Sequence, residues 1–339
     1  MTVILACVLV VVVLLGPILL RPVERNLELF FLIVGILTAI AMGQFDAALM
    51  RSALSEPIAL SAAVLIFGIV FRFLRNYLDR FFAGAIRILG ERWLCFGLAI
   101  IAGLLAGFIT VVIAALVFVE AISMLRLDRK AEVGVTVYGC FAIGIGGGLT
   151  PLGMPASALV LANLHADFWY LARLLGPFIV AGIVLVAIPI LFLPMKGGKK
   201  HPIAERDSWL SIMIRAGKVY IFIAGLVALS RGLQPVVDFY LVRAPDAFWF
   251  WLNTLSAVVD NATLAAVEIG PALSVSQQRA ALLSLLISGG MLVPGNLPNI
   301  VAAGRLEIAS REWMGPGLRT GIALLVICFA VLTVMAIYH

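Results

Sequence analysis

Charged side chains are scarce in this sequence. Asp, Glu, Lys and Arg together make up 12% of the 339 residues, whereas a soluble domain carries about 25%. Apolar residues account for 63%, and the mean hydropathy is +1.14. The net charge is +6, but no basic stripe with interleaved aromatic residues accompanies it, so nucleic-acid binding is not expected. This composition indicates an integral membrane protein with room for roughly eight to ten spans.

The residue types that usually carry catalysis or bind transition metals are also few. The four cysteines lie in apolar stretches without pairing or metal-ligand spacing, and the three histidines are scattered. No nucleophile-and-base pattern is visible. We therefore expect no enzyme and no cofactor; an intramembrane enzyme and a passive channel stay open as minor alternatives. The alternation typical of β-strands is absent too, and the predicted fold class is all-α.

Apolar runs bounded by charge or proline predict eight spans. They cover about residues 2–20, 27–43, 56–74, 131–165, 170–194, 208–231, 277–304 and 316–338. The first run lacks the basic region of a cleaved signal peptide, so we expect it to be retained. Two more apolar segments, 91–126 and 246–274, are too long for one crossing. The apolar character of each is interrupted near its middle by small or polar residues. A re-entrant hairpin would explain each of them.

The distribution of basic residues supports this topology. With the amino terminus outside and both hairpins re-entrant, 18 of the 24 Lys and Arg residues lie on the cytoplasmic side. Five lie outside, and Lys218 falls within a span. Positive residues are enriched in cytoplasmic loops. We therefore expect eight spans, two hairpins and both termini outside, in the inner (plasma) membrane of a prokaryote.

One glycine- and proline-rich phrase occurs twice in the apolar sequence. Residues 146–155 read GGGLTPLGMP, and residues 289–299 read GGMLVPGNLPN. Proline removes a backbone donor and clashes with the preceding helical turn, so neither segment can be an uninterrupted helix. In lipid, such breaks are tolerated where the freed backbone groups are buried in protein or face a cavity. Paired broken spans are typical of secondary transporters.

The repeated phrase divides the chain into three parts. Residues 1–55 form an added two-helix segment. Repeat 1 covers 56–195, with hairpin 91–126 and broken helix 131–165. Repeat 2 covers 207–339, with hairpin 246–274 and broken helix 277–304. Because one repeat starts outside and the other inside, the two are predicted to have inverted topology.

The second hairpin carries the strongest candidate for an ion site. Its weak point, residues 256–263, reads SAVVDNAT and places Asp260 near mid-membrane. A carboxylate there is costly unless it is paired, protonated or bound to a cation. Hard cations such as Na⁺ prefer oxygen ligands. The candidate oxygen ligands are Asp260, Asn261, Ser256, Thr263, Asn296, Asn299 and the backbone near Gly289 and Gly290, with Asp260 and Asn261 as the Na⁺ ligands. The simpler alternative is that Asp260 only caps a helix.

The first half offers less chemistry at the matching places. Thr110 is the polar side chain near the first hairpin tip, and the first broken loop adds Gly146, Gly147, Thr150 and Ser157. One cation site in the second half is therefore favoured over two symmetric sites.

Three further charged residues are candidates for a proton relay. Glu120 and Glu268 occupy matching places in the two hairpins, where each is either a relay or gating residue or a solvated or hydrogen-bonded carboxylate at the hairpin base. Lys218 either extends to the interface or is a counter-charge to Asp260 or Glu268.

These motifs resemble the ion transporter superfamily. That group includes NhaD-type sodium/proton antiporters, arsenite permeases and divalent-anion/sodium symporters. Residues 146–155 match its broken-helix phrase, and 256–263 are similar to the antiporter and arsenite-permease hairpin tip. The compact length and residues 289–299 are similar to a little-characterised cation-transporter branch, domain of unknown function 1646, that includes MamN. The resemblance implies alternating access by hairpins and broken helices moving against a scaffold, often within a homodimer.

The sequence departs from the superfamily pattern in ways that bear on the substrate. The first hairpin lacks the Asn of a second sodium site, and Met154-Pro155-Ala156 replaces the usual ending of the phrase. These departures favour exchange of Na⁺, or another small cation, for protons. The alternative is a sodium- or proton-coupled symporter of a small inorganic or organic anion. The expected partners are that ion or anion and the lipid bilayer.

Overall fold

The computed structural model of the chain describes residues 26–125, 127–195, 209–240, 250–251, 253–254, 269 and 273–338, and the single positions 12, 16 and 23. Within these ranges the regular elements are α-helices and short 3-10 turns. Six helices are long and apolar enough to cross a membrane, judged by length and composition: Ala47–Leu74, Gly84–Ile109, Arg129–Leu149, Tyr170–Phe192, Trp209–Leu233 and Ser310–Ile337. They indicate a membrane-embedded, all-helical protein.

Three helical segments form one tightly packed group. These are α3 (Leu27–Ala41), the first part of α4 (Ala47–Ile109) and α9 (Trp209–Tyr240). Glycines allow the backbones to touch: a Cβ on Gly225 of α9 would lie 2.4 Å from the Leu32 nitrogen, and one on Gly35 would lie 2.3 Å from the Gly225 oxygen. A Cβ on Gly68 of α4 would lie 2.8 Å from the Ile212 side chain of α9. Small residues permit such close packing between membrane helices.

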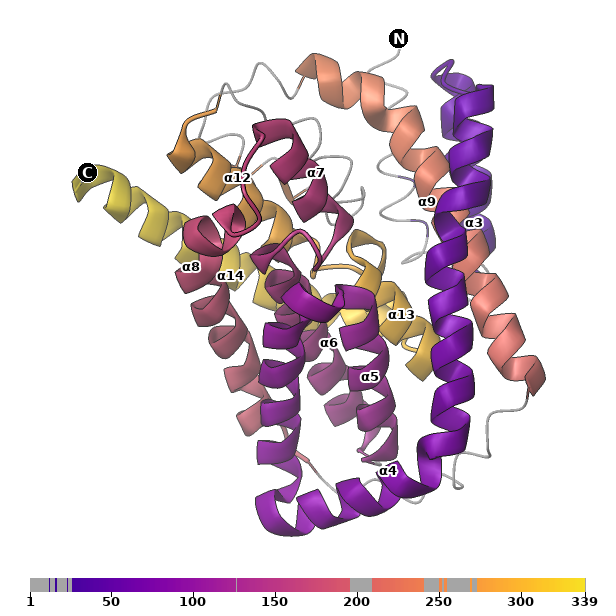
Figure 1. The fold of residues 1–339 in the computed structure, drawn as a ribbon, viewed down its shortest axis with the longest axis vertical. Helices are drawn as coiled ribbons and strands as arrows, with labels where there is room; N and C mark the ends of the chain where they lie inside the picture. Colours follow the sequence, from indigo (N-terminus) through magenta and orange to yellow (C-terminus); the bar gives the residue numbers. More distant parts are fainter. Residues whose placement is uncertain are drawn as a thin grey trace.

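Helix α4 changes direction at the lower end of the molecule, where it runs across and then returns upward (Figure 1). Its backbone is non-helical at Gly90, with φ 73° and ψ 158°. The returning part ends at Thr110, where φ is 78°, and α5 (Val111–Met124) runs back from there. The turn of the predicted first hairpin therefore lies at Thr110. Its re-entry into a membrane stays a prediction.

Both repeated phrases interrupt a helix, as the glycines and prolines predict. The first break separates α6 (Arg129–Gly146) from α7 (Pro155–Leu164), with a 3-10 turn at Gly147–Leu149. The second separates α12 (Val275–Ser288) from α13 (Leu297–Leu306), with a 3-10 turn at Val293–Gly295. Helices α7 and α13 each have 10 residues and end on a left-handed residue, His165 and Glu307 respectively.

Two helices, α8 (Tyr170–Ala187) and α14 (Ser310–Tyr338), complete the described elements around the breaks. Helix α8 continues into a 3-10 turn at Ile188–Phe192 and packs against α6, and α14 packs against α12 and α6. Most of α6 is buried, whereas α14 exposes many apolar residues. Helix α6 is therefore the centre of the described bundle.

The boundaries differ from the sequence prediction in three places. Helix α9 continues to Tyr240, where a span ending at residue 231 was expected. Helix α3 has 15 residues and is shorter than a full span. The Gly84–Ile109 segment, expected to be part of a hairpin, is long enough to cross. The expected span 2–20 and most of the second hairpin lie outside the described residues, so the number of spans and the inverted repeats stay predictions.

Candidate functional site

The first broken loop is closed by hydrogen bonds from its own polar side chains. Ser157, in the first turn of α7, donates to the Gly147 carbonyl at 3.2 Å. Thr150 is fully buried and donates to the carbonyl of Gly107, on the returning part of α4. Val111 completes the contact by donating its backbone N–H to the Gly153 carbonyl at 2.9 Å. The hairpin tip and the loop are thus joined, with Thr110, Thr150 and Ser157 in one region.

Backbone contact between glycines makes this arrangement possible. A Cβ on Gly146 would lie 1.8 Å from the Gly103 oxygen, and one on Gly107 would lie 2.9 Å from the Gly146 oxygen. A Cβ on Gly147 would instead meet side chains, at 2.3 Å from Val111 and 2.8 Å from Met154. Of these predicted site glycines, Gly146 and Gly147 therefore have a packing role that their sequence pattern alone does not reveal.

The second broken loop uses an amide where the first uses a hydroxyl. Asn299 is fully buried in α13 and donates to the carbonyls of Gly289 and Leu292, both at 2.8 Å. The bond from Asn299 to Gly289 matches that from Ser157 to Gly147. This correspondence pairs Gly147 with Gly289, one position away from the pairing of Gly146 with Gly289 that the repeated phrase suggests.

Neighbouring helices hold the second loop from two sides. Trp313 of α14 is fully buried and donates its indole N–H to the Gly290 carbonyl at 3.2 Å. A Cβ on Gly317 would lie 2.3 Å from the Met291 oxygen. On the α6 side, a Cβ on Gly290 would lie 2.4 Å from the Phe141 ring. The loop is therefore buried in protein, the condition under which a broken helix is stable in a membrane.

Several buried polar atoms at this loop lack a partner among the described residues. They are the Ser288 hydroxyl oxygen, the Asn299 side-chain oxygen Oδ1 and the Asn296 amide nitrogen Nδ2. Ser288 directly precedes Gly289, whose carbonyl Asn299 binds. A buried polar atom without a hydrogen bond costs about 1–3 kcal/mol. The concentration of such atoms at one broken loop marks it as the candidate binding site.

The remaining predicted ion ligands cannot be placed beside this loop. Asp260, Asn261, Ser256 and Thr263, and the predicted relay residue Glu268, lie outside the described residues. Within the described ranges, no group of three His, Cys, Asp or Glu residues could hold a metal ion. At the loop itself, the buried side-chain oxygens without a described partner are those of Ser288 and Asn299.

Glu120, the relay candidate on α5, forms an ion pair that the sequence did not suggest. Its carboxylate accepts from the Arg305 guanidinium of α13 at 2.8 Å to each oxygen, and Ser123 donates to it at 3.0 Å. The Glu120 side chain is 9% exposed and the Arg305 side chain 19%. Glu120 is therefore buried and hydrogen-bonded rather than solvated.

Lys218, the third relay candidate, also has a described partner. Its ammonium group lies 3.0 Å from the Glu28 carboxylate of α3, and its side chain is 52% exposed. The predicted counter-charges were Asp260 and Glu268, neither of which is described. The contact with Glu28 joins α9 to α3.

A second arginine-centred cluster holds the end of α13. Arg129, at the start of α6, donates to the Leu306 and Glu307 carbonyls at 2.9 and 2.8 Å. It also binds the carboxylate of Glu312 on α14 through two nitrogens, at 2.8 and 2.7 Å. Helices α6, α13 and α14 are therefore tied together at this end.

Sequence reasoning missed Ser288, Arg305 and Trp313 as members of this region. Ser288 had a local signal, because it ends the helix just before the glycine pair. Arg305 and Trp313 gave no such signal, since each meets a partner that only the folded chain brings near.

Comparison with protein families adds one result. A profile of the family described as "Protein of unknown function (DUF1646)" matches residues 2–335, nearly the whole chain. The chain belongs to this family. This family is the compact branch that the sequence motifs resemble, whereas membership of the wider ion transporter superfamily stays a prediction. No curated protein matches this DUF1646 member, so its function is argued from the broken loops.

Proposed function

We propose that this protein is a secondary active transporter that exchanges Na⁺, or another small cation, for protons by alternating access. The observation that carries the proposal is the interrupted α12–α13 segment, where buried oxygens of Ser288 and Asn299 have no partner among the described residues. Secondary transporters form their ion sites at such unwound helices, near the middle of the bilayer.

The chemistry of the loop supports a hard cation. Hydroxyl, amide and carbonyl oxygens are the ligands that Na⁺ and similar ions accept. A cation bound there would satisfy the Ser288 hydroxyl and Asn299 Oδ1, whose burial is otherwise unfavourable. The loop would then hold the ion without any transition-metal ligand.

The proton-coupling group in this proposal is Asp260. Its sequence position predicts a hairpin tip near mid-membrane, with Asn261, Ser256 and Thr263 beside it. A carboxylate that holds either a cation or a proton, but not both, gives exchange directly. Asp260 and Asn261 are therefore the proposed cation ligands, together with the oxygens of the α12–α13 loop.

One observation favours a second candidate function. Asn296 precedes the first residue of α13, and its buried Nδ2 has no acceptor among the described residues. An unsatisfied donor at a helix N-terminus suits an anion. The alternative is therefore a sodium- or proton-coupled symporter of a small anion.

Proton flux in proteoliposomes containing a pH-sensitive dye distinguishes the two functions. The wild type, Asp260→Asn and Ser288→Ala proteins receive Na⁺, Li⁺, K⁺ or candidate anions in turn. Cation-driven proton movement that is lost in Asp260→Asn and weakened in Ser288→Ala is the result expected for exchange. Proton movement that requires an added anion would favour the symporter instead.

A further inference from the structure

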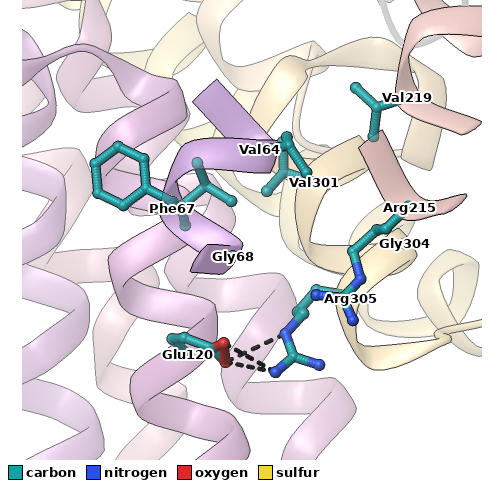
Figure 2. Close-up of a pocket in the computed structure, with 10 residues that line it drawn as sticks. Val64, Phe67, Gly68, Glu120, Arg215, Val219, Val301, Gly304 and Arg305 are labelled. Carbon is teal, nitrogen blue, oxygen red and sulfur yellow. Dashed lines mark hydrogen bonds and ion pairs between the residues drawn. The ribbon is translucent and has the colours of Figure 1, made fainter. Parts of the chain in front are cut away.

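The Glu120–Arg305 ion pair lines a small cavity between two groups of helices. One wall comes from the tightly packed α4–α9 unit and includes Phe67, Gly68 and Arg215. The other wall comes from α5 and α13 and includes Glu120 and Arg305. Arg215 also lines this cavity, and in the view of Figure 2 its side chain extends toward that of Arg305. One buried carboxylate and two arginines carried by different helices therefore line the same cavity.

The packing on the two sides of the cavity differs. Helix α9 meets α3 and α4 through backbone-to-backbone and glycine contacts, as at Gly225 and Gly68. Helix α9 also touches α13, but a small cavity lies between α9 and the α5–α13 pair. Packed interiors resist sliding, whereas a seam with a void requires fewer contacts to be broken. Relative motion of the two groups is thus easiest along this seam.

A buried carboxylate makes such motion costly unless it stays paired. Removing the partner of a buried charge is strongly destabilising, because the remaining charge is left without compensation. Glu120 and Arg305 would separate if α5 and α13 moved apart or shifted differently against α9. Arg215 is placed to take over, because its guanidinium group already faces the same cavity.

We propose that Glu120 exchanges partners between two arginines. It binds Arg305 in the described conformation and binds Arg215 when α5 and α13 shift by different amounts against α9 during transport. This inference rests on the proposed transport function, and it adds Arg215 as a positioning residue for the conformational change. The exchange keeps the carboxylate compensated in both states, which lowers the barrier between them.

A double-mutant cycle tests the exchange without any knowledge of the transported ion. The Tm of the purified full-length protein in detergent is measured for R215Q, R305Q and the double variant. Arg215 replaces Arg305 as the partner in R305Q, so R215Q is expected to lower Tm more in that background than in wild type. Additive changes would overturn the proposal, since independent sites add. R319Q, an exposed arginine on α14, is the control and is expected to be additive with R305Q.

Two further variants separate exchange from simple repulsion between the arginines. In the E120Q background the coupling of R215Q with R305Q is expected to vanish, whereas repulsion would leave it intact. If E120Q cannot be purified, R215K distinguishes exchange from repulsion, because a lysine keeps the positive charge. In the R305Q background, exchange predicts a higher Tm for R215K than for R215Q. Equal Tm values for the two would overturn the exchange.

Transport provides an independent readout. R215Q is expected to lower turnover by about tenfold, equivalent to about 1.4 kcal/mol in the barrier. Unchanged turnover in R215Q would overturn the exchange even if the proposed function holds. Absence of transport in the wild type would instead count against the proposed function, and the Tm cycle would still decide whether Glu120 can use both arginines.

Discussion

Ser288 and Asn299 show how neighbouring polar residues at one loop can have different tasks. The Asn299 amide nitrogen binds two loop carbonyls, so this residue stabilises the broken helix. The Ser288 hydroxyl is equally buried but has no described partner. Asn299 therefore stabilises the broken helix, and in the proposed transport function the Ser288 hydroxyl and Asn299 Oδ1 are the atoms that bind the ion.

Alanine substitutions are expected to separate these two tasks. Asn299→Ala removes the bonds to the Gly289 and Leu292 carbonyls, although the Leu292 carbonyl keeps its bond from the Gly295 N–H. A buried group left unsatisfied costs about 1–3 kcal/mol. Its Tm is expected to fall clearly. Ser288→Ala removes no described bond, so its Tm stays close to wild type while cation-driven transport weakens. Thermal unfolding in detergent and flux in proteoliposomes check both expectations. A Tm loss in Ser288→Ala as large as in Asn299→Ala would contradict this division of tasks.

At this scale, sequence reasoning identified polar residues but not their partners. It selected Asn299, Ser157 and Thr150 because they are the oxygen-bearing side chains that the broken loops offer to an ion. It could not find the Arg305 partner of Glu120, because the two are 185 residues apart in sequence. Pairing over such a separation depends on how the helices pack.

At the scale of the elements, glycines determine where helices bend and how closely they approach. Gly90 has φ 73° and ψ 158°, a conformation almost restricted to glycine, and it redirects α4 after the lower crossing. Gly103 and Gly107 have ordinary helical geometry and instead allow contact with the end of α6. The same residue type thus has a conformational role in one place and a packing role in another.

Alanine at Gly90 is expected to be destabilising for backbone reasons alone. No atom lies within 4 Å of the position that a Cβ would occupy, so the cost is that of the positive φ, at least about 1–2 kcal/mol. Gly97 is the matched control: it is helical, and its Cβ position is also open. Gly97→Ala is expected to raise stability by up to about 1 kcal/mol. Thermal unfolding of both variants checks the opposite signs; equal shifts would contradict the role given to Gly90.

Alanine at Gly146 is expected to destabilise the protein far more than alanine at Gly90. Its Cβ would lie 1.8 Å from the Gly103 oxygen, and a backbone atom cannot yield as a flexible side chain can. The first broken loop would have to separate from α4, so poor expression or a large Tm loss is expected. Gly176→Ala, with open space at its Cβ position, is the control. A Gly146→Ala protein as stable as wild type would contradict the close packing.

Sequence patterns located elements better than they located helix ends. Glycine and proline predicted both helix breaks, because these residues act on the local backbone. The predicted span ended at residue 231, before Pro235, yet helix α9 runs through this proline to Tyr240. Matching the shared letters of the two phrases aligns Gly146 with Gly289. The corresponding hydrogen bonds of Ser157 and Asn299 instead align Gly147 with Gly289, one residue away.

On the scale of the whole molecule, the described helices form two groups separated by a seam. Helix α3, the first part of α4 and α9 form one group, joined by glycine contacts and by the Lys218–Glu28 pair. The returning part of α4, α5 and the broken helices form the other group, and the Glu120–Arg305 pair lies beside the seam. Such an arrangement fits alternating access, in which one group moves against the other around a fixed site.

Composition and hydropathy were sufficient to predict a membrane-embedded helical protein, because both reflect the solvent around the chain. The seam was not predictable, since a cavity depends on how Val64, Leu116 and Val301 pack rather than on their apolar character. The second hairpin with Asp260 remains a sequence prediction.

The most direct test of the central claim is proton flux in proteoliposomes of wild type and Asp260→Asn under an imposed Na⁺ gradient. The account predicts Na⁺-driven proton movement in the wild type, or the same response to another small cation, and its loss in Asp260→Asn. Wild-type vesicles without cation-driven proton movement, or an Asp260→Asn protein as active as wild type, would contradict it.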